Sequence, residues 1–167
     1  EMIEVHDNEP TWVGTNTALP NRVIRSALDA RLFPELGNYQ SIRPEVKYGK
    51  GGRSRIDFLL EGTRKSIYVE VKNTTWVEGR LSMFPDTVTE RGQKHLQELI
   101  DVLPEARAVM LYYINRGDCD RFSPGDSADP RYGELLRAAG GFPGGAPAAA
   151  RAPGPVDDCG HPCRLPR

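Results

Sequence analysis

The chain has 167 residues, of which 38% are hydrophobic, and its formal net charge at pH 7 is -1. This length suits one modest domain with a single core, and a near-neutral charge argues against a protein that binds nucleic acid through its overall charge. No apolar run approaches the roughly 18 residues of a membrane-spanning helix, and the N-terminus lacks a signal-peptide pattern, so we expect a cytoplasmic protein without membrane contact. Cys119 is the only thiol before residue 140, which excludes a disulfide framework.

The first predicted elements are a helix and a strand. Residues 1–5 look like the end of a strand, and residues 20–31 place apolar side chains at helical spacing behind Pro20. Residues 41–48 predict the first strand of a sheet. The Gly-rich residues 49–52 that follow predict a turn.

A β-hairpin is predicted next, from strands at 55–61 and 66–73 with a polar loop of four residues between them. If the loop is 62–65, the numbers of paired residues sum to 127. Asp57 then lies opposite Glu70, with Cβ atoms about 5 Å apart, and Arg55 lies opposite Lys72.

The remaining elements complete an α/β order of helix, three strands, helix and strand. Asp86 or Thr87 can cap a helix that extends to about Leu103, with Leu96, Leu99, Ile100 and Leu103 as its buried stripe. Residues 106–115 form a near-continuous apolar run, typical of a strand reached by a crossover connection. A last short helix begins at 129–130 and continues to Ala139.

The hairpin carries the strongest chemical signal. Alternation places Asp57, Glu70 and Lys72 on one side of the sheet. It sends the apolar residues to the other side, namely Ile56, Phe58, Leu60, Ile67, Val69 and Val71. Two converging carboxylates suit Mg²⁺ or Mn²⁺, and a neighbouring lysine could orient a water or stabilise charge in a phosphoryl transfer. The alternative is a solvated strand face with ordinary ion pairs.

The spacing of these residues resembles a known nuclease motif. Asp57, twelve intervening residues and then Glu70-Val71-Lys72 are similar to the PD-(D/E)xK pattern, with Ile56 where that pattern often has Pro. Further segments resemble the sugar fermentation stimulation protein family from about residue 1 to 138, namely 16–22, 46–49, 54–57, 68–73, 83–86, 89–95 and 120–124.

The resemblance implies a restriction-endonuclease-like α/β core, with a mixed central sheet flanked by helices, at residues 19–139. Residues 1–18 would be a remnant leading out of an N-terminal OB-like domain that is missing here. The family is described as DNA-binding, with a suspected regulatory role in sugar metabolism, so the implied partner is DNA.

Two further site residues come from this resemblance. Glu35 precedes the first strand, where related nucleases often supply another acidic metal ligand, although it could equally end a solvated helix. Gln93 lies on the helix after the motif strands, where related nucleases place a polar residue facing the scissile phosphate. The alternative for Gln93 is an exposed helix face, and His95 is expected at the helix surface or partly buried rather than as a catalytic base.

A local basic segment surrounds the proposed acidic site. Its candidates for contacts to nucleic acid are Arg43, Lys47, Lys50, Arg53 and Arg55. Cations beside an acidic metal site suit a phosphodiester substrate, whereas the alternative is a solubilising surface.

The composition changes abruptly after Ala139. Residues 140–167 are rich in Gly, Pro and Ala and cannot bury enough apolar surface to order themselves. We expect a disordered tail, either natural or, as we favour, the product of out-of-frame translation. Cys159, His161 and Cys163 in it make a weak zinc candidate, because structural zinc needs four ligands in an ordered site.

Two functional classes follow from the sequence. The first is a Mg²⁺- or Mn²⁺-dependent DNA nuclease that uses Asp57, Glu70 and Lys72, assisted by Gln93 and Glu35. The second is a non-catalytic, sequence-nonspecific DNA-binding regulator with the same fold. A non-functional fragment is the third and weakest alternative, and the sequence leaves the oligomeric state undetermined.

Overall fold

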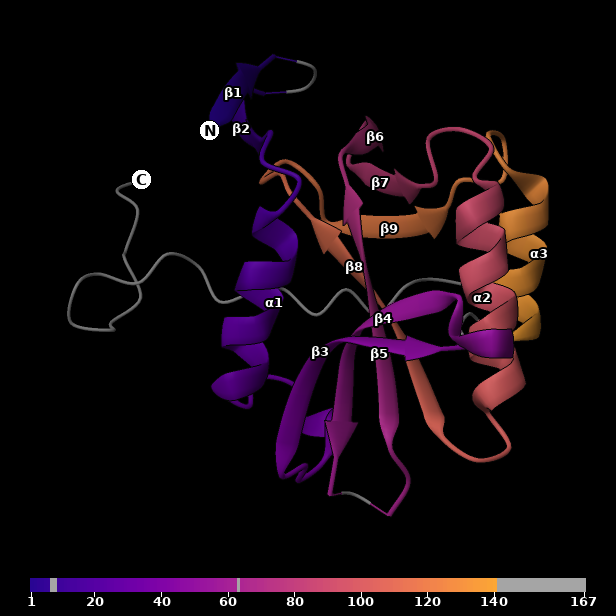
Figure 1. Cartoon of the computed structure of the whole chain (residues 1–167). Helices are drawn as coiled ribbons and strands as arrows, with labels where there is room; N and C mark the ends of the chain where they lie inside the picture. The colour runs from indigo at the N-terminus through magenta and orange to yellow at the C-terminus, as the bar shows by residue number, and fades with distance from the viewer. Residues whose placement is uncertain (7–8, 63, 141–167) are drawn as a thin grey trace.

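The computed structural model describes residues 1–6, 9–62 and 64–140. Its centre is a four-stranded sheet in the order β3–β4–β5–β8 (Figure 1). These strands are β3 (Ser41–Tyr48), β4 (Ser54–Glu61), β5 (Ile67–Thr74) and β8 (Arg107–Ile114). The first three are antiparallel neighbours, whereas β8 runs parallel to β5 because the chain returns through a helix. The predicted mixed α/β fold is confirmed.

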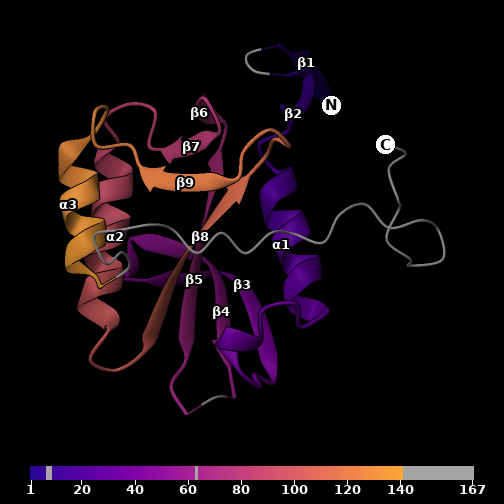
Figure 2. The same ribbon diagram turned by 180° about the vertical axis from the view of Figure 1, so that it is seen from behind.

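Helices cover the two sides of this sheet (Figures 1 and 2). Helix α1 (Leu19–Asp29) packs on one side, and α2 (Glu90–Val102) and α3 (Pro130–Ala138) pack together on the other. The apolar stripe of α1 faces the sheet because Ile24 and Leu28 are one helical turn apart, and both are buried. The site strands are therefore held between helices from two directions.

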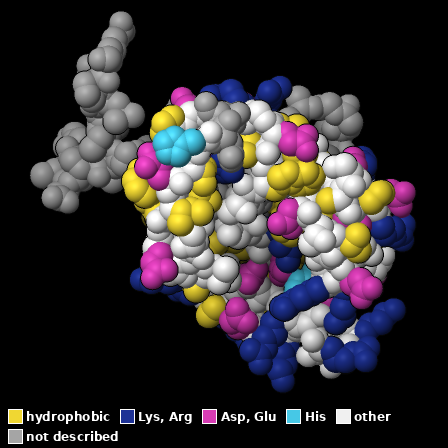
Figure 3. Space-filling model, turned by 90° about the horizontal axis from the view of Figure 1, so that it is seen from above, with side chains coloured by type: hydrophobic (Ala, Val, Ile, Leu, Met, Phe, Trp, Pro, Cys, Tyr) yellow, Lys and Arg dark blue, Asp and Glu magenta, His cyan; other side chains and the backbone are white. Residues whose placement is uncertain are grey.

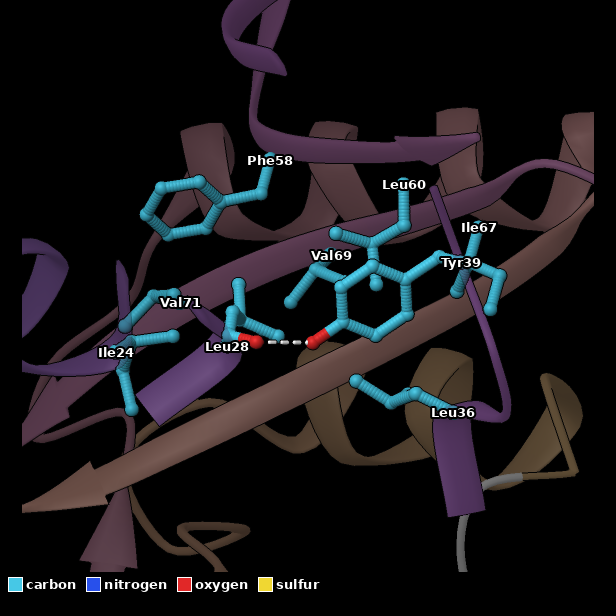
Figure 4. Close-up of a cluster of buried hydrophobic side chains, with 9 residues drawn as sticks. All are labelled: Ile24, Leu28, Leu36, Tyr39, Phe58, Leu60, Ile67, Val69 and Val71. Atoms are coloured by element: carbon cyan, nitrogen blue, oxygen red, sulfur yellow. Dashed lines mark hydrogen bonds between the residues drawn. The ribbon is translucent and has the colours of Figure 1, made fainter. Parts of the chain in front are cut away.

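The largest core cluster lies between α1 and the sheet (Figure 4). The Tyr39 hydroxyl donates a hydrogen bond to the carbonyl of Leu28, which ties the end of α1 to the segment before β3. The cluster consists of Ile24, Leu28, Leu36, Tyr39, Phe58, Leu60, Ile67, Val69 and Val71. This cluster fixes the side of β5 that faces away from Glu70.

Most of the short elements were not predicted from the sequence. Strand β1 (Met2–Val5) agrees with the strand end expected at residues 1–5, but β2 (Thr11–Gly14), which forms a hairpin with it before α1, was not predicted. A separate three-stranded sheet consists of β6 (Trp76–Glu78), β7 (Leu81–Phe84) and β9 (Arg121–Pro124). Two 3₁₀ turns, η1 (Pro34–Leu36) and η2 (Lys50–Gly52), flank β3. Strands of three or four residues are too short to show a clear alternation in the sequence.

The boundaries of the second helix differ from the prediction. Thr89 caps α2 by accepting a hydrogen bond from the Gly92 N–H, so the cap is neither Asp86 nor Thr87. Leu103 follows the helix and is 38% exposed, so it is not part of the buried stripe. The last helix agrees with the prediction, because Asp129 caps α3 through the Tyr132 N–H.

The predicted hairpin register is confirmed, but only along part of the strands. Phe58 pairs with Val69, Leu59 with Tyr68 and Leu60 with Ile67, and each pair sums to 127. The pairing ends there, so Asp57 and Glu70 are not a cross-strand pair and Arg55 is not opposite Lys72. Strand β4 instead stays paired with β3 and leaves β5.

The β3–β4 pair bends at this point. Glu45 has a φ of 54°, in the left-handed region, and it interrupts the ladder opposite Asp57. Beyond the bend, Ile56 packs with Tyr48 and with Leu99 of α2, not with the α1-side core. The prediction for Ile56 was wrong because period-2 alternation assumes a straight strand.

Two expectations from the sequence concern the chain as a whole. No helix among residues 1–6, 9–62 and 64–140 is long and apolar enough to cross a membrane. The predicted disordered tail and the weak zinc candidate lie outside the described residues, apart from Gly140.

Candidate active site

Asp57 occupies the point at which β4 separates from β5. Its Oδ2 accepts a hydrogen bond of 2.7 Å from the Val71 backbone N–H. Its Oδ1 accepts a hydrogen bond of 2.8 Å from Nδ2 of Asn21, on the first turns of α1. The carboxylate therefore takes the place of a backbone acceptor of β4 for this N–H of β5, and the contact holds it beside Glu70.

Glu70 lies on β5 and is only 3% exposed. Its Oε1 accepts two hydrogen bonds of 2.6 Å, one from Nζ of Lys72 and one from Nδ1 of His95 on α2. Its Oε2 is buried and has no hydrogen-bond partner among the described residues. One oxygen of this carboxylate is thus doubly paired, and the other is left unpaired, which is costly in a buried site.

The two carboxylates affect each other electrostatically. Burial, together with the charge of Glu70, raises the pKa of Asp57 above its usual value, although hydrogen bonds from Val71 and Asn21 oppose this shift. Burial also acts to raise the pKa of Glu70. The hydrogen bonds and charges of His95 and Lys72 outweigh burial, so that the pKa of Glu70 lies below its usual value. Glu70 is therefore ionised at neutral pH, whereas the fold disfavours the charged form of the neighbouring Asp57.

This donor set fits a hard divalent cation. Carboxylate oxygens are the preferred ligands of Mg²⁺ and Mn²⁺, and Mg²⁺ is commonly held by one or two carboxylates, with waters and substrate completing its coordination. Glu70 Oε2 is unpaired and the charge of Asp57 is unfavourable. A cation would offset both. Within the described part of the chain, no group of three or more His, Cys, Asp and Glu is arranged to hold a metal, so protein ligands alone do not complete a site.

The structure places the other two predicted site residues elsewhere. Glu35 is an exposed residue of η1, and its backbone carbonyl accepts a hydrogen bond from Arg107, which pairs with Ile67 three residues before Glu70. Gln93 donates through Nε2 to both oxygens of Asp129, at 3.0 Å each. The structure thus unites Asp57, Glu70 and Lys72, without Glu35 or Gln93.

Sequence reasoning missed two residues that complete this arrangement. Asn21 supports Asp57, and His95, 5% exposed, supports Glu70. His95 lies three residues before Glu98 and four before Leu99, both of which are buried, and this helical spacing was the available signal for its orientation.

Further unpaired polar groups lie where α2 meets the bent β3–β4 pair. The Tyr48 hydroxyl and Glu98 Oε2 are buried and have no hydrogen-bond partner among the described residues. Burial, with the charges of Glu70, Glu98 and Asp57, strongly raises the pKa of Tyr48. Tyr48 therefore lies within the electrostatic reach of the site, and its hydroxyl stays protonated.

The predicted basic residues divide into two groups. Lys47, Lys50, Arg53 and Arg55 are all exposed around the tip of the β3–β4 hairpin. Figure 3 shows Lys and Arg side chains gathered at the lower right of this face, with Asp or Glu and a His at their inner margin. Arg43 lies farther back along β3 and pairs with Glu61 at 3.3 Å. We call Lys47, Lys50, Arg53 and Arg55 the basic tip.

Comparison with known proteins identifies the family. The family described as "Sugar fermentation stimulation protein RE domain" matches residues 18–141. The chain belongs to the sugar fermentation stimulation protein family. The "Sugar fermentation stimulation protein homolog" of Picosynechococcus sp. is 65% identical over 141 residues, which are 83% of this chain and 56% of the relative. The homolog of Synechococcus elongatus is 67% identical over 137 residues, which are 82% and 57% of the two chains.

A solved structure of the family has the same fold. It is described as "The structure of Pyrococcus Furiosus SfsA in complex with Ca2+" and is 31% identical to this chain, with a TM-score of 0.70. The similarity covers 77% of this chain and 55% of that one. The chain thus spans little more than half the length of the curated relatives it matches and of this structure.

Proposed function

We propose that this member of the family is a metal-dependent DNA nuclease built on a PD-(D/E)xK core. The observation that carries the proposal is the convergence of Asp57 and Glu70, with the buried Oε2 of Glu70 unpaired and Lys72 at 2.6 Å from the other oxygen. A buried carboxylate oxygen that lacks a hydrogen-bond partner is costly, and a bound cation would remove that cost. The related Pyrococcus furiosus protein is described as a complex with Ca²⁺, which is consistent with this interpretation.

Each residue has a distinct role in the proposed reaction. Asp57 and Glu70 would hold Mg²⁺ or Mn²⁺, which when bound polarises a phosphoryl oxygen and acidifies a coordinated water. Lys72 is 15% exposed at its side chain, so its ammonium can reach both Glu70 and a substrate. It would orient the attacking water or offset charge on the phosphate in the transition state. Asn21 keeps the Asp57 carboxylate in place during this step.

The basic tip supports DNA as the substrate. Its four cations extend from the β3–β4 hairpin, which also supplies Asp57, so the cations and the carboxylate belong to one structural element. Positive side chains neutralise backbone phosphates without regard to base sequence, and they would position a strand over the site.

A non-catalytic DNA-binding regulator is the second candidate function. The observation that favours it is that the cations of the basic tip are separate from the carboxylate site. Lys47, Lys50 and Arg53 make no hydrogen bond or ion pair with the three site residues, Asp57, Glu70 and Lys72, in the described structure. Binding through the basic tip therefore needs no chemistry at the carboxylates.

Cleavage assays separate the two candidates. Single-stranded, duplex and flap DNA would be incubated with the purified chain and Mg²⁺ or Mn²⁺, beside Asp57→Asn and Lys72→Met. Asp101→Asn, an exposed acid on α2, is the matched control. The nuclease proposal expects cation-dependent cutting that both site variants lose and the control keeps. Binding without cutting by folded protein would instead support the regulator.

A further inference from the structure

We propose that His95 is a positioning residue that orients Glu70, so that Oε2 faces the cation and Lys72 is free to move to the substrate. This inference rests on the proposed function and adds a residue to its site. Neither the PD-(D/E)xK spacing nor the basic segment pointed to His95, which was expected at the helix surface or partly buried. Its contact with Glu70 comes only from the tertiary structure.

The hydrogen bonds of Glu70 define the role of His95. Nδ1 of His95 and Nζ of Lys72 both lie 2.6 Å from Oε1, and no described residue contacts Oε2 through a hydrogen bond. An ionised carboxylate only accepts hydrogen bonds, so Nδ1 carries the proton of this contact. Rotating the carboxylate out of this plane would break two short, charge-assisted hydrogen bonds. The two donors together therefore fix the direction in which the second oxygen is presented to a cation.

The two donors differ in mobility. Lys72 has a long side chain that is 15% exposed, and its ammonium can leave Oε1 without moving the backbone. The His95 side chain is 7% exposed and has only two rotatable bonds. It is fixed by α2, whose neighbouring residue Leu96 packs on Tyr132 of α3 and whose Leu99 packs on Ile56 of β4. When Lys72 turns to a phosphate, His95 is the donor that stays and preserves the orientation of Glu70.

A purely structural role makes a different prediction. If His95 only fills space between α2 and β5, an apolar residue of similar size would serve as well, and the loss of its hydrogen bond would change folding stability alone. An orienting role requires an N–H at the position of Nδ1. Donors that hold a metal ligand in place typically change metal affinity or activity by about 10- to 100-fold when they are removed.

Two substitutions at one position test the inference without measuring turnover. His95→Asn keeps an N–H donor close to the position of Nδ1, whereas His95→Leu fills the space but has no donor. Ca²⁺ binding to the full chain would be followed by isothermal titration calorimetry without DNA, and thermal melts without cation would report folding. Glu70→Gln removes a proposed ligand, and His6→Leu, at an exposed histidine, is the matched control.

The expected result is a loss of Ca²⁺ affinity of about 10- to 100-fold in His95→Leu and of less than about 3-fold in His95→Asn, with His6→Leu unchanged. Equal losses in both His95 variants, or no loss in a folded His95→Leu, would overturn the positioning role and leave the cation site intact. An unmodified chain that binds no divalent cation would refute the proposed function itself, together with this inference.

Discussion

Two buried acidic centres contact helix α2, and their carboxylates differ in how fully they are hydrogen-bonded. Asp129 is 1% exposed, and both of its oxygens are paired: Oδ1 accepts from the Tyr132 N–H, Oδ2 accepts from the Thr89 N–H, and Gln93 donates to both. Glu70 is similarly buried but leaves Oε2 unpaired among the described residues. The acid beside it, Asp57, has a raised pKa, whereas the pKa of Asp129 is lowered.

The contrast separates a carboxylate with a structural role from the pair that we propose to be functional. Burial alone would raise the pKa of Asp129, but the hydrogen bonds from Gln93 and from the backbone outweigh it, so its charge stabilises the junction of α2 and α3. In the pair of Asp57 and Glu70, the hydrogen bonds do not compensate both charges. Buried charges that the folded chain does not fully compensate are characteristic of a site that binds a ligand of opposite charge.

The strongest test of this contrast is Asp57→Asn. We expect the cation-dependent cleavage rate to fall by at least about 100-fold, because a ligand and its charge are lost. The free energy of unfolding without cation should fall less than in Asp129→Asn, since the charge of Asp57 is disfavoured in the folded state and that of Asp129 is favoured. Urea unfolding of both variants, beside cleavage assays, measures the two effects. A larger stability loss in Asp57→Asn would contradict the distinction.

Asp129→Asn should destabilise the fold by about 2 kcal/mol at pH 7, because an amide N–H would face a buried donor. The folded pKa of Asp129 lies below that of the unfolded chain, about 4. The stabilisation by its charge is therefore complete above that pH and is lost as the pH falls through the folded pKa. We expect the difference between the variant and the unmodified chain to narrow below about pH 4 in urea titrations. A difference that is constant with pH would mean that ionisation of Asp129 contributes nothing.

Gln93→Ala should cost about 1.5 kcal/mol of stability, the typical value of hydrogen bonds to a charged group. Its cleavage rate per folded molecule should stay within about 3-fold of normal, because Gln93 contacts Asp129 and not the site. Steady-state assays at a temperature well below the melting transition check this expectation. A fall of about 100-fold with the fold intact would restore the role that the sequence predicted for Gln93.

The smallest expected effect concerns the basic tip. Replacing Lys47 and Arg53 by Ala should reduce the slope of log affinity against log salt by about 2 for duplex DNA, because each substitution removes one cation that neutralises a phosphate. The folding free energy should change little, because both residues are exposed. Arg43→Ala, whose side chain pairs with Glu61, is the comparison variant. An equal change of slope in Arg43→Ala would place the DNA interface along β3 instead of at the tip.

Local patterns in the sequence predicted the sheet well and the helix faces poorly. The limits of β3 and the register from Phe58 to Leu60 were correct, because alternation and a short polar loop fix the pairing of adjacent strands. His95 was expected at the helix surface or partly buried and is buried, whereas Gln93, predicted to face a phosphate, donates to Asp129 in this structure. Gln93 and His95 are two residues apart and so point about 200° apart around α2, and the direction that faces the sheet depends on how the helix packs.

The sequence by itself determined the order of the main helices and of the central strands, the hairpin, the closeness of Asp57 and Glu70, and the family, because each follows from short-range spacing or from motifs along the chain. The tertiary structure decided the bend at Glu45, the unpaired oxygen of Glu70 and the approach of His95. Glu70 and His95 are 25 residues apart and meet because apolar packing fixes the rotation of α2 against the sheet and α3. Such contacts depend on the packing of the whole core, which no local pattern encodes.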